Sequence, residues 1–416
     1  MTALRSWVPR ADGSGFPAEH LPYGVVSTDG GPPRVGVRIG DQVLDLARLA
    51  ADGVGGLREL LAGTAARPTL NDLMALGPAR WEDLRSRLVD LVCDPGHRSA
   101  VEPALVDVAD CTLHLPVEVA DYVDFYSSIE HATNLGRLFR PGGDPLLPNW
   151  RHLPVAYHGR AGTVVVSGTP VPRPAGQRRV GDDVVFGPSE RLDIELEVGT
   201  VIGVPSAPGR AVPVAEAMEH VFGLVLVNDW SARDIQAWEY QPLGPFLGKS
   251  FATTMSAWVT PLAALRGCRT GGPTQDPPPL PYLRLDEDWA FDLRLAVDLQ
   301  PAGAGAAETV SRTTFAGLYW RVPQQIAHLT VNGAHLRTGD LLASGTVSGP
   351  ERGSEGSLIE MTRGGTDPLA VAGATRTFLE DGDAVVLRAS ALVGDGVELT
   401  LGEAAGRIDA WPGAAG

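Results

Sequence analysis

Cysteine is scarce in this sequence, and acidic residues outnumber basic ones. The three cysteines, Cys93, Cys111 and Cys268, are far apart and odd in number, so neither a disulfide framework nor a cysteine-based zinc site is predicted. The 50 acidic residues against 34 basic ones give a formal net charge of −16, which disfavours binding to nucleic acid or to anionic membranes. A small acidic substrate remains compatible with this charge, because a local pocket can be basic inside an acidic protein.

Long apolar runs are also missing. No run approaches membrane-spanning length, and the N-terminal stretch to Phe16 lacks the basic start and apolar core of a secretory signal. The expectation is a cytoplasmic protein. With 416 residues, 44% of them hydrophobic, the chain can bury a large core and is long enough for two or three domains.

Glycine and proline are abundant and separate short apolar segments, which predicts a mainly β protein with few helices. Residues 33–46 predict two strands around a turn at Gly40-Asp41, and residues 57–92 predict interrupted helices. A turn-rich stretch follows, so the expected domains are 1–115 and 116–416. The best later helix candidate is 313–333, in which Pro323 should kink the helix or end its first half.

The stretch LGPFLGKS, residues 243–250, superficially matches a phosphate-binding loop. A Walker loop has four residues between its glycines. Gly244 and Gly248 have only three between them, and one is Pro245, which has no N–H to offer a phosphate. A nucleotide site is therefore disfavoured. The following GKSFA also lacks the last glycine of the G-x-S-x-G elbow, so a serine triad is unsupported.

Carboxylates gather in LDIELEVG, residues 192–199. Period-two geometry would point Asp193, Glu195 and Glu197 to one face of a strand, where like charges repel unless they are exposed or neutralised by a cation. On spacing alone a solvated outer face is slightly favoured over a cation site.

Two further segments combine polar groups. In residues 224–240 an apolar strand ends at Asp229, and Asp229 or Ser231 could cap a short helix. The spacing places Asp229, Arg233, Gln236 and Tyr240 on one helical face. That stripe is either functional or an exposed polar face, with Trp230, Ile235 and Trp238 on the buried side.

The second segment, residues 121–140, holds Asp124, Tyr126, His131 and Arg140. A lone histidine is more often structural than catalytic, so His131 alone decides nothing. A Gly- and Ser-rich loop is expected before a strand around Glu360.

Taken together, these motifs are long, ordered and specific, and the chain resembles the fumarylacetoacetase (fumarylacetoacetate hydrolase) family over nearly its full length. The resemblance is carried by DYVDFYSSIEHATNLGRLFR, LPVAYHGRAGTVVVSGTP, FGPSERLDIELEVG, LVNDWSARDIQAWEYQPLGPFLGKSFATT, VNGAHLRTGDLLASGTVSGPE and FLEDGDAV, while LPYGVVS and RVGVRIGDQVLDL match the family's N-terminal domain. It implies an N-terminal SH3-like β-barrel, a C-terminal mixed β-roll and a homodimer.

The resemblance also implies a metal-dependent hydrolysis of the carbon–carbon bond of 4-fumarylacetoacetate to fumarate and acetoacetate, the last step of tyrosine and phenylalanine catabolism. It implies four ligands for a divalent cation, namely Asp124, Glu195, Glu197 and Asp229. All-oxygen ligands suit Mg²⁺ or Ca²⁺. A second Mg²⁺ is implied near Asp229, Lys249 and Thr253.

The remaining implied roles fall on residues that match the family's motifs. His131 is the expected general base, with Glu360 orienting it. The expected oxyanion donors are Arg233, Gln236 and Lys249. The expected substrate contacts, which again include Gln236, are Tyr126, Arg140, Tyr157, Tyr240 and Thr346.

The sequence departs from the family pattern at IEH before the histidine, in the insert of the 260s–280s, in the C-terminal tail and at Pro323. Related activities, on acylpyruvates or as oxo-diacid decarboxylases and hydratases, are the alternatives, and many of those relatives lack the N-terminal domain. A non-catalytic metal-binding scaffold is a more distant alternative, which the presence of His131, Glu360, Arg233 and Lys249 disfavours.

Overall fold

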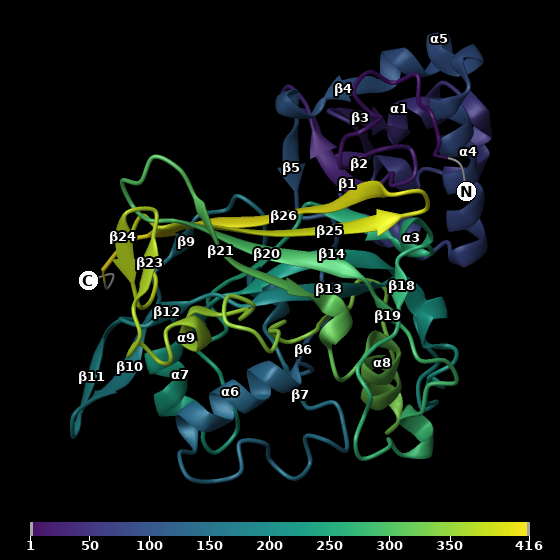
Figure 1. Ribbon diagram of the computed structural model, residues 1–416. Coiled ribbons are helices and arrows are strands. Elements are labelled where there is room, and N and C mark those ends of the chain that lie inside the picture. The colour runs from purple at the N-terminus through teal and green to yellow at the C-terminus, as the bar shows by residue number, and fades with distance from the viewer. Residues whose placement is uncertain (1–2, 414–416) are drawn as a thin grey trace.

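A computed structural model describes residues 3–413 of the chain. The structure is mainly β with minor helix, as predicted, and its largest sheet runs through the middle of the molecule (Figure 1). In pairing order the main path of this sheet is β4 (Leu105–Asp107), β3 (Gln42–Asp45), β2 (Arg34–Ile39), β1 (Tyr23–Ser27), β17 (Trp258–Pro261), β14 (Val221–Asp229), β13 (Leu196–Ile202), β22 (Leu341–Ala343), β6 (Tyr122–Phe125) and β7 (Ala156–His158).

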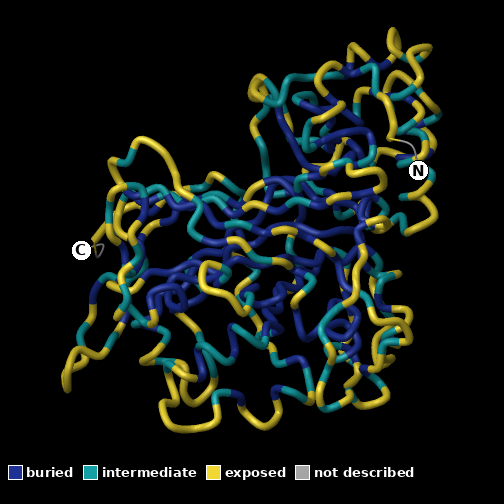
Figure 2. Tube along the Cα trace, viewed as in Figure 1, coloured by how far each residue is buried: buried dark blue, intermediate teal, exposed yellow. Residues whose placement is uncertain are grey.

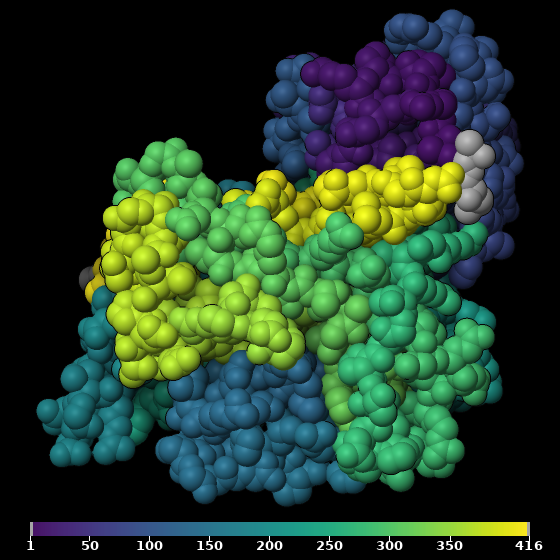
Figure 3. Space-filling view, in the orientation of Figure 1, coloured from purple at the N-terminus to yellow at the C-terminus, as the bar shows by residue number. Residues whose placement is uncertain are grey.

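The N-terminal residues form a lobe at the upper right of the space-filling view, where it rests on the yellow C-terminal strands (Figure 3). The predicted hairpin around Gly40 is confirmed as β2 and β3, with Val37 opposite Leu44. β5 (Thr112–His114) pairs with β1, whereas β4 pairs with β3. No pairing joins β4 to β5 within residues 3–413, so closure into an SH3-like barrel stays a prediction. The helices of this lobe are α1 (Leu46–Ala51), α2 (Leu57–Leu61), α3 (Asn71–Met74), α4 (Pro78–Cys93) and α5 (Arg98–Val101).

β13 and β14 are buried along their whole length (Figure 2). Leu224 and Leu226 of β14 belong to the larger hydrophobic core, while Val225 and Val227 pack into the core shared with the N-terminal lobe. Because successive side chains point to opposite faces of a strand, one strand contributes to both cores. This explains why its sequence is continuously apolar rather than alternating.

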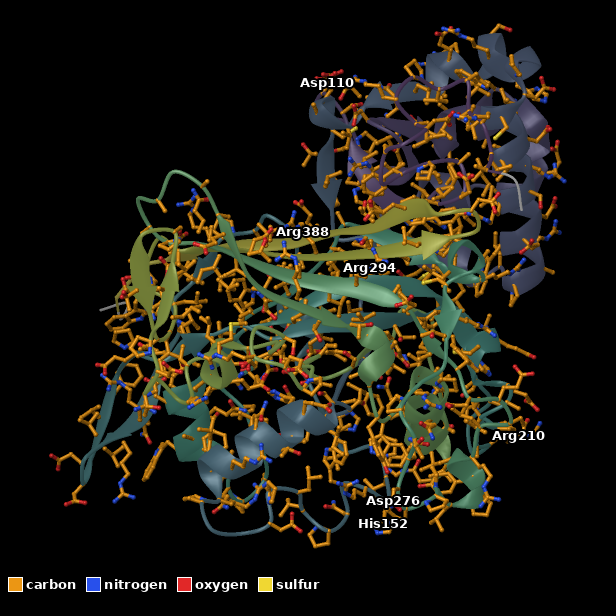
Figure 4. The ribbon with its side chains drawn as sticks, in the orientation of Figure 1. Asp110, His152, Arg210, Asp276, Arg294 and Arg388 are labelled. Carbon is orange, nitrogen blue, oxygen red and sulfur yellow. The ribbon has the colours of Figure 1, made fainter. Side chains whose placement is uncertain are left out.

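A second sheet packs against the larger core. Its order is β21 (Glu308–Thr314), β20 (Leu293–Gln300), β25 (Ala384–Val393), β26 (Val397–Asp409) and β9 (Val171–Pro172). Leu295 and Leu387 on its inner face join the core of β14. Arg294 and Arg388, on neighbouring strands, are exposed (Figure 4). The sheet therefore shows the alternation expected when one face is solvated.

Short elements complete the fold. The paired short strands are β8 (Val164–Val166) with β16 (Thr253–Met255), β10 (Ala175–Val180) with β11 (Asp183–Pro188), β12 (Leu192–Asp193) with β15 (Ser231–Ala232), β18 (Arg269–Thr270) with β19 (Ala290–Phe291), and β23 (Leu369–Val371) with β24 (Ala374–Arg376). The helices of this part are α6 (Ile129–Phe139), α7 (Arg233–Glu239), α8 (Val322–Thr330) and α9 (Leu358–Met361). Within residues 3–413, no helix has the length and apolar character that a membrane crossing requires.

The predicted helix over 313–333 is wrong in its first half. β21 continues to Thr314, and α8 begins at Val322, with Pro323 in its first turn. Proline is tolerated there because the first N–H groups of a helix have no partner within it. Pro323 therefore starts the helix instead of kinking it.

The other local expectations also need correction. Asp229 ends β14 and does not cap α7, whose N-cap residue, Ala232, offers no side chain hydrogen bond. Of the three residues that the exposed-face alternative placed on the buried side, Trp230 and Ile235 are buried but Trp238 is 41% exposed. Glu360 lies in the short helix α9 and not in a strand. The errors at Asp229 and Glu360 arose because local pattern does not report where an element ends.

Candidate active site

Four carboxylates meet where neighbouring strands of the large sheet end. β22 lies between β6 and β13, and β14 pairs with β13 on its other side. This order brings Asp124, Glu195, Glu197 and Asp229 together, with one oxygen of each within 4.8 Å of the others. All four are buried. The solvated outer face that the spacing slightly favoured is therefore wrong.

The carboxylate cluster carries more acceptors than the protein satisfies. Asp124 Oδ1 and both carboxylate oxygens of Glu197 are buried without a hydrogen-bond partner among the described residues. Burial, and then the charge of Asp229, raises the pKa of Asp124 well above its usual range. Burial and the charge of Asp124 do the same to the pKa of Glu197. Buried oxygens of this kind fit a hard divalent cation, which would keep them ionised.

Lys249, the only lysine in the sequence, reaches into this cluster. Its Nζ donates to Glu195 Oε2 and, at 2.7 Å, to Asp229 Oδ2. Tyr157 also donates to Asp229 Oδ2, at 2.9 Å, and Thr253 Oγ1 donates to Asp229 Oδ1 at 3.2 Å. Burial alone would raise the pKa of Glu195, but the charges of Lys249 and Arg233 lower it to about 2.

The turn that carries Lys249 holds no free phosphate cradle. The N–H groups of Phe246 and Gly248 both donate to Glu239 Oε1, at 2.9 and 2.7 Å. Gly248 also lies so close to α7 that a Cβ there would be 2.8 Å from the Cβ of Gln236. Because Gly248 has no side chain, the turn can pack onto α7. The N–H groups of Phe246 and Gly248 already donate to Glu239 and are not free to bind a phosphate. This supports the rejection of a nucleotide site.

His131 lies in the first turn of α6. Ser128, the N-cap residue, accepts from the His131 N–H, and the His131 Nδ1 lies 2.6 Å from Glu360 Oε2. Nε2, on the other side of the ring, faces the carboxylate cluster, 3.9 Å from Glu195 Oε1. Burial would raise the pKa of Glu360, but the charge and hydrogen bond of His131 lower it below its usual range.

Sequence reasoning missed the other partners of Glu360. Ser357 Oγ and Ser348 Oγ donate to Glu360 Oε2 at 2.6 and 2.9 Å, and Asn134 Nδ2 donates to Oε1 at 3.0 Å. One signal was available: Asn134 follows His131 by three residues, so both face the same side of α6. The serines come from the Gly- and Ser-rich loop, whose path no periodicity predicts.

Arg233 begins α7 beside the carboxylate cluster. Its Nη1 lies 3.3 Å from Gln236 Oε1. Its Nη2 lies 2.8 Å from Glu195 Oε1 but lacks the alignment of a hydrogen bond. Its Nε donates at 2.8 Å to Asp193, which is fully buried outside the cluster, contrary to the expectation that Asp193 shares the face of Glu195. The strand is interrupted between Asp193 and Leu196, so its alternation does not carry through.

A cavity of about 490 Å³ opens onto these groups. It is lined by Asp124, Glu195 and His131, by the three expected oxyanion donors, and by the five other expected substrate contacts, Tyr126, Arg140, Tyr157, Tyr240 and Thr346. The Thr346 hydroxyl is buried and has no partner among the described residues. Glu197, Asp229, Thr253 and Glu360 lie behind this wall and do not line the cavity.

A buried acidic cluster that could hold a metal ion lies beside a His–Glu pair, and the chain belongs to the fumarylacetoacetate hydrolase family. The family model for the fumarylacetoacetate hydrolase C-terminal region matches residues 122–408, and the fumarylacetoacetase N-terminal model matches residues 19–116.

Similar curated proteins carry the name fumarylacetoacetase. The human protein is 47% identical over 412 residues, covering 97% of this chain and 98% of its own length. The Caenorhabditis elegans protein is 46% identical over 416 residues, covering 97% and 99%. A solved fumarylacetoacetate hydrolase from Exiguobacterium antarcticum has a TM-score of 0.55 at 16% identity over 94% of this chain and 99% of its own, which shows a shared fold.

Proposed function

We propose that this protein hydrolyses the carbon–carbon bond of 4-fumarylacetoacetate, giving fumarate and acetoacetate, as the names of its full-length relatives indicate. The observation that carries the proposal is the pairing of His131 with Glu360 at the edge of the carboxylate cluster, where His131, Asp124 and Glu195 line one cavity. Water must attack a ketone carbon, and an enolate must leave. The site has a group suited to each requirement.

Asp124, Glu195, Glu197 and Asp229 are the proposed ligands of a divalent cation, Mg²⁺ or Ca²⁺. Their donor set is all oxygen, and three of their oxygens are buried without partners, which suits a hard cation better than zinc. Such a cation supplies an electron sink for the enolate leaving group. Lys249, Thr253 and Asp229 form the proposed surroundings of a second, structural Mg²⁺.

His131 is the proposed general base. Glu360 is held as a carboxylate by four hydrogen bonds and accepts the Nδ1 proton of His131. This leaves Nε2, on the side of the carboxylate cluster, to accept a proton from water. The hydroxide equivalent adds to the ketone carbon. The carbon–carbon bond then breaks, and the acetoacetate enolate takes up the proton that His131 removed from the water.

Arg233, Gln236 and Lys249 are the proposed donors to the tetrahedral alkoxide. All three line the cavity, and Arg233 Nη2 is a buried N–H donor without an aligned partner. Preformed donors stabilise a developing negative charge because they need not reorganise during the reaction. Tyr126, Arg140, Tyr157, Tyr240 and Thr346 are the proposed substrate contacts, again with Gln236.

Several finer features belong to the same proposal. They are a homodimer, a cytoplasmic location, an SH3-like barrel at the N-terminus, and a domain division into 1–115 and 116–416. The family models break at a similar place. A sedimentation-velocity measurement tests the dimer, and limited proteolysis near residue 115 tests the division.

The decisive experiment is a spectrophotometric assay with purified protein and Mg²⁺ on fumarylacetoacetate beside simple acylpyruvates. We expect turnover of fumarylacetoacetate with a kcat/KM at least about tenfold above that for any acylpyruvate, a difference of about 1.4 kcal/mol in transition-state stabilisation. Turnover of acylpyruvates alone would assign the chain to that related activity. Binding of cation without turnover of either substrate would favour a scaffold.

A further inference from the structure

Asp193 is a fully buried carboxylate for which the proposed reaction has no use. It precedes Glu195 by two residues but is not part of the four-carboxylate cluster. Burial raises the pKa of Asp193, while Arg233 opposes the rise. A carboxylate removed from water is costly unless it is hydrogen-bonded and paired, so its contacts indicate what it does.

The Asp193 carboxylate accepts four hydrogen bonds. Its Oδ1 accepts from the N–H groups of Ile194 and Leu358, at 2.8 and 2.7 Å. Its Oδ2 accepts from the N–H of Ile359 at 3.1 Å and from Arg233 Nε at 2.8 Å. Three backbone donors thus fix the carboxylate, and a fourth interaction holds the arginine. Leu358 and Ile359 begin α9, the helix that carries Glu360.

The carboxylates of the cluster compete with Asp193 for the Arg233 guanidinium. The carboxylate cluster beside it contains unpartnered oxygens on Asp124 and Glu197, and a free guanidinium would be drawn toward them. There it would occupy the position that a divalent cation needs. Because Nε donates to Asp193, this edge of the guanidinium is not available to the cluster. Nη1 then lies near Gln236 and Nη2 near Glu195.

We infer that Asp193 is a positioning residue. It fixes Arg233 in the orientation needed to donate to the reacting oxygen, and it ties Arg233 to the start of α9, the helix that carries Glu360. The effect on catalysis rests on the proposed function. The contact between Asp193 and Arg233 is observed independently of that function. Asp193 does not line the cavity and is not one of the four clustered carboxylates. It acts only through Arg233 and the start of α9.

The test is Asp193→Asn, which keeps the shape but sets an amide N–H against Arg233 Nε or a backbone N–H. We expect kcat to fall about 10- to 100-fold, as for other residues that orient a functional group, with KM changed less than about threefold. In an Arg233→Lys background the same change should lower kcat by less than about twofold, because the partner is already gone.

The matched control is Asp383→Asn. Asp383 is also fully buried, pairs with Arg376 at 2.8 and 2.9 Å, and accepts from two backbone N–H groups, but it lies outside the site. This variant should lose thermal stability and keep its kcat. Two results would overturn the inference in favour of a merely structural role. One is an equal loss of kcat in Asp193→Asn and Asp383→Asn. The other is that Asp193→Asn lowers kcat in the Arg233→Lys background as much as it does in the wild-type protein.

A second measurement does not depend on turnover. In protein labelled with ¹⁵N-arginine, the Arg233 Nε–H resonance, assigned by its loss in Arg233→Lys, should exchange slowly with solvent. Asp193→Asn should make it exchange faster, and Asp383→Asn should not. A rapidly exchanging Nε–H in the wild-type protein overturns the inference even if Asp193→Asn does not fold. Failure of wild-type turnover, with a protected Nε–H, would instead overturn the proposed function alone.

Discussion

His131 and Glu360 are 229 residues apart in the chain, yet His131 Nδ1 lies 2.6 Å from Glu360 Oε2 in a fully enclosed contact. α6 and α9, which carry them, lie side by side (Figure 1). The contact fixes the ring so that its other nitrogen is turned to the carboxylate cluster. The first prediction tests what the histidine does there.

His131→Ala should lower kcat by roughly 10²- to 10⁴-fold, the usual contribution of a positioned general base. Single-turnover kinetics on fumarylacetoacetate measures it. The circular dichroism spectrum should remain that of the wild type. Near-normal turnover in a folded His131→Ala variant would remove His131 from the role of base.

Chelation should abolish turnover, since the carboxylate cluster holds buried, unpartnered oxygens that suit a divalent cation. Exhaustive dialysis against EDTA followed by addition of Mg²⁺ or Ca²⁺ should restore it. Glu197→Gln should need a higher cation concentration for the same rate, about 10-fold or more for the loss of one charged ligand. Undiminished activity after complete chelation, checked by elemental analysis, contradicts the metal site.

The acid stability of the protein should depend on Glu360. Its pKa is lowered in the folded state by His131 despite burial. A carboxyl with a lowered folded pKa stabilises the fold above its unfolded pKa, about 4.3, and that stability is lost as the pH falls through the folded value. Wild-type protein should therefore lose more unfolding free energy between about pH 5 and pH 3 than Glu360→Gln, measured by urea titration.

An exposed control, Glu190→Gln, should follow the wild-type curve because the Glu190 side chain is 69% exposed. Parallel pH curves for wild type and Glu360→Gln would show that the His131 contact does not depress the Glu360 pKa.

Lys249 gives an unusually clean probe, because ¹⁵N-lysine labelling marks a single side chain. Burial would lower the pKa of Lys249, but the charges of Asp229 and Glu195 raise it. Its ammonium signal should be observable and should shift when Mg²⁺ is added, since the proposed cation would share Glu195 and Asp229 with the ammonium. Heteronuclear NMR measures the shift, and Lys249→Arg assigns the signal. An unchanged signal at saturating Mg²⁺ would place the cation elsewhere.

Gly248→Ala should disturb α7. The added Cβ would lie 2.8 Å from the backbone nitrogen of Gln236, so the turn and the helix must move apart, at a cost of about 1–3 kcal/mol. Thermal unfolding should show the loss, and kcat should fall because Gln236 and Lys249 shift. Gly162→Ala, whose Cβ would meet nothing within 4 Å, should be near neutral. Equal stability of the two variants would show that the contact is not tight.

Much of the candidate site was accessible from the sequence, because its residues stand in long motifs. The residues expected to be metal ligands do converge, and the expected substrate contacts do line one cavity. The placement of Asp193 was not accessible. Its spacing from Glu195 matched a continuous strand, but β12 ends at Asp193 and β13 begins at Leu196. Alternation holds only within an unbroken strand.

Local sequence by itself determined the hairpin of β2 and β3, the apolar β14 and the unsuitability of LGPFLGKS for phosphate, because each depends on residues that are neighbours in the chain. Tertiary structure alone decided that Glu195 and Glu197 are buried, that Glu239 occupies the amides of the turn, and that Asp193 brackets Arg233 against α9. The Glu239 contacts span only 7 and 9 residues but need the turn to fold back onto α7, and the Asp193 contacts to Arg233 and Leu358 span 40 and 165 residues. No local period encodes either kind of meeting.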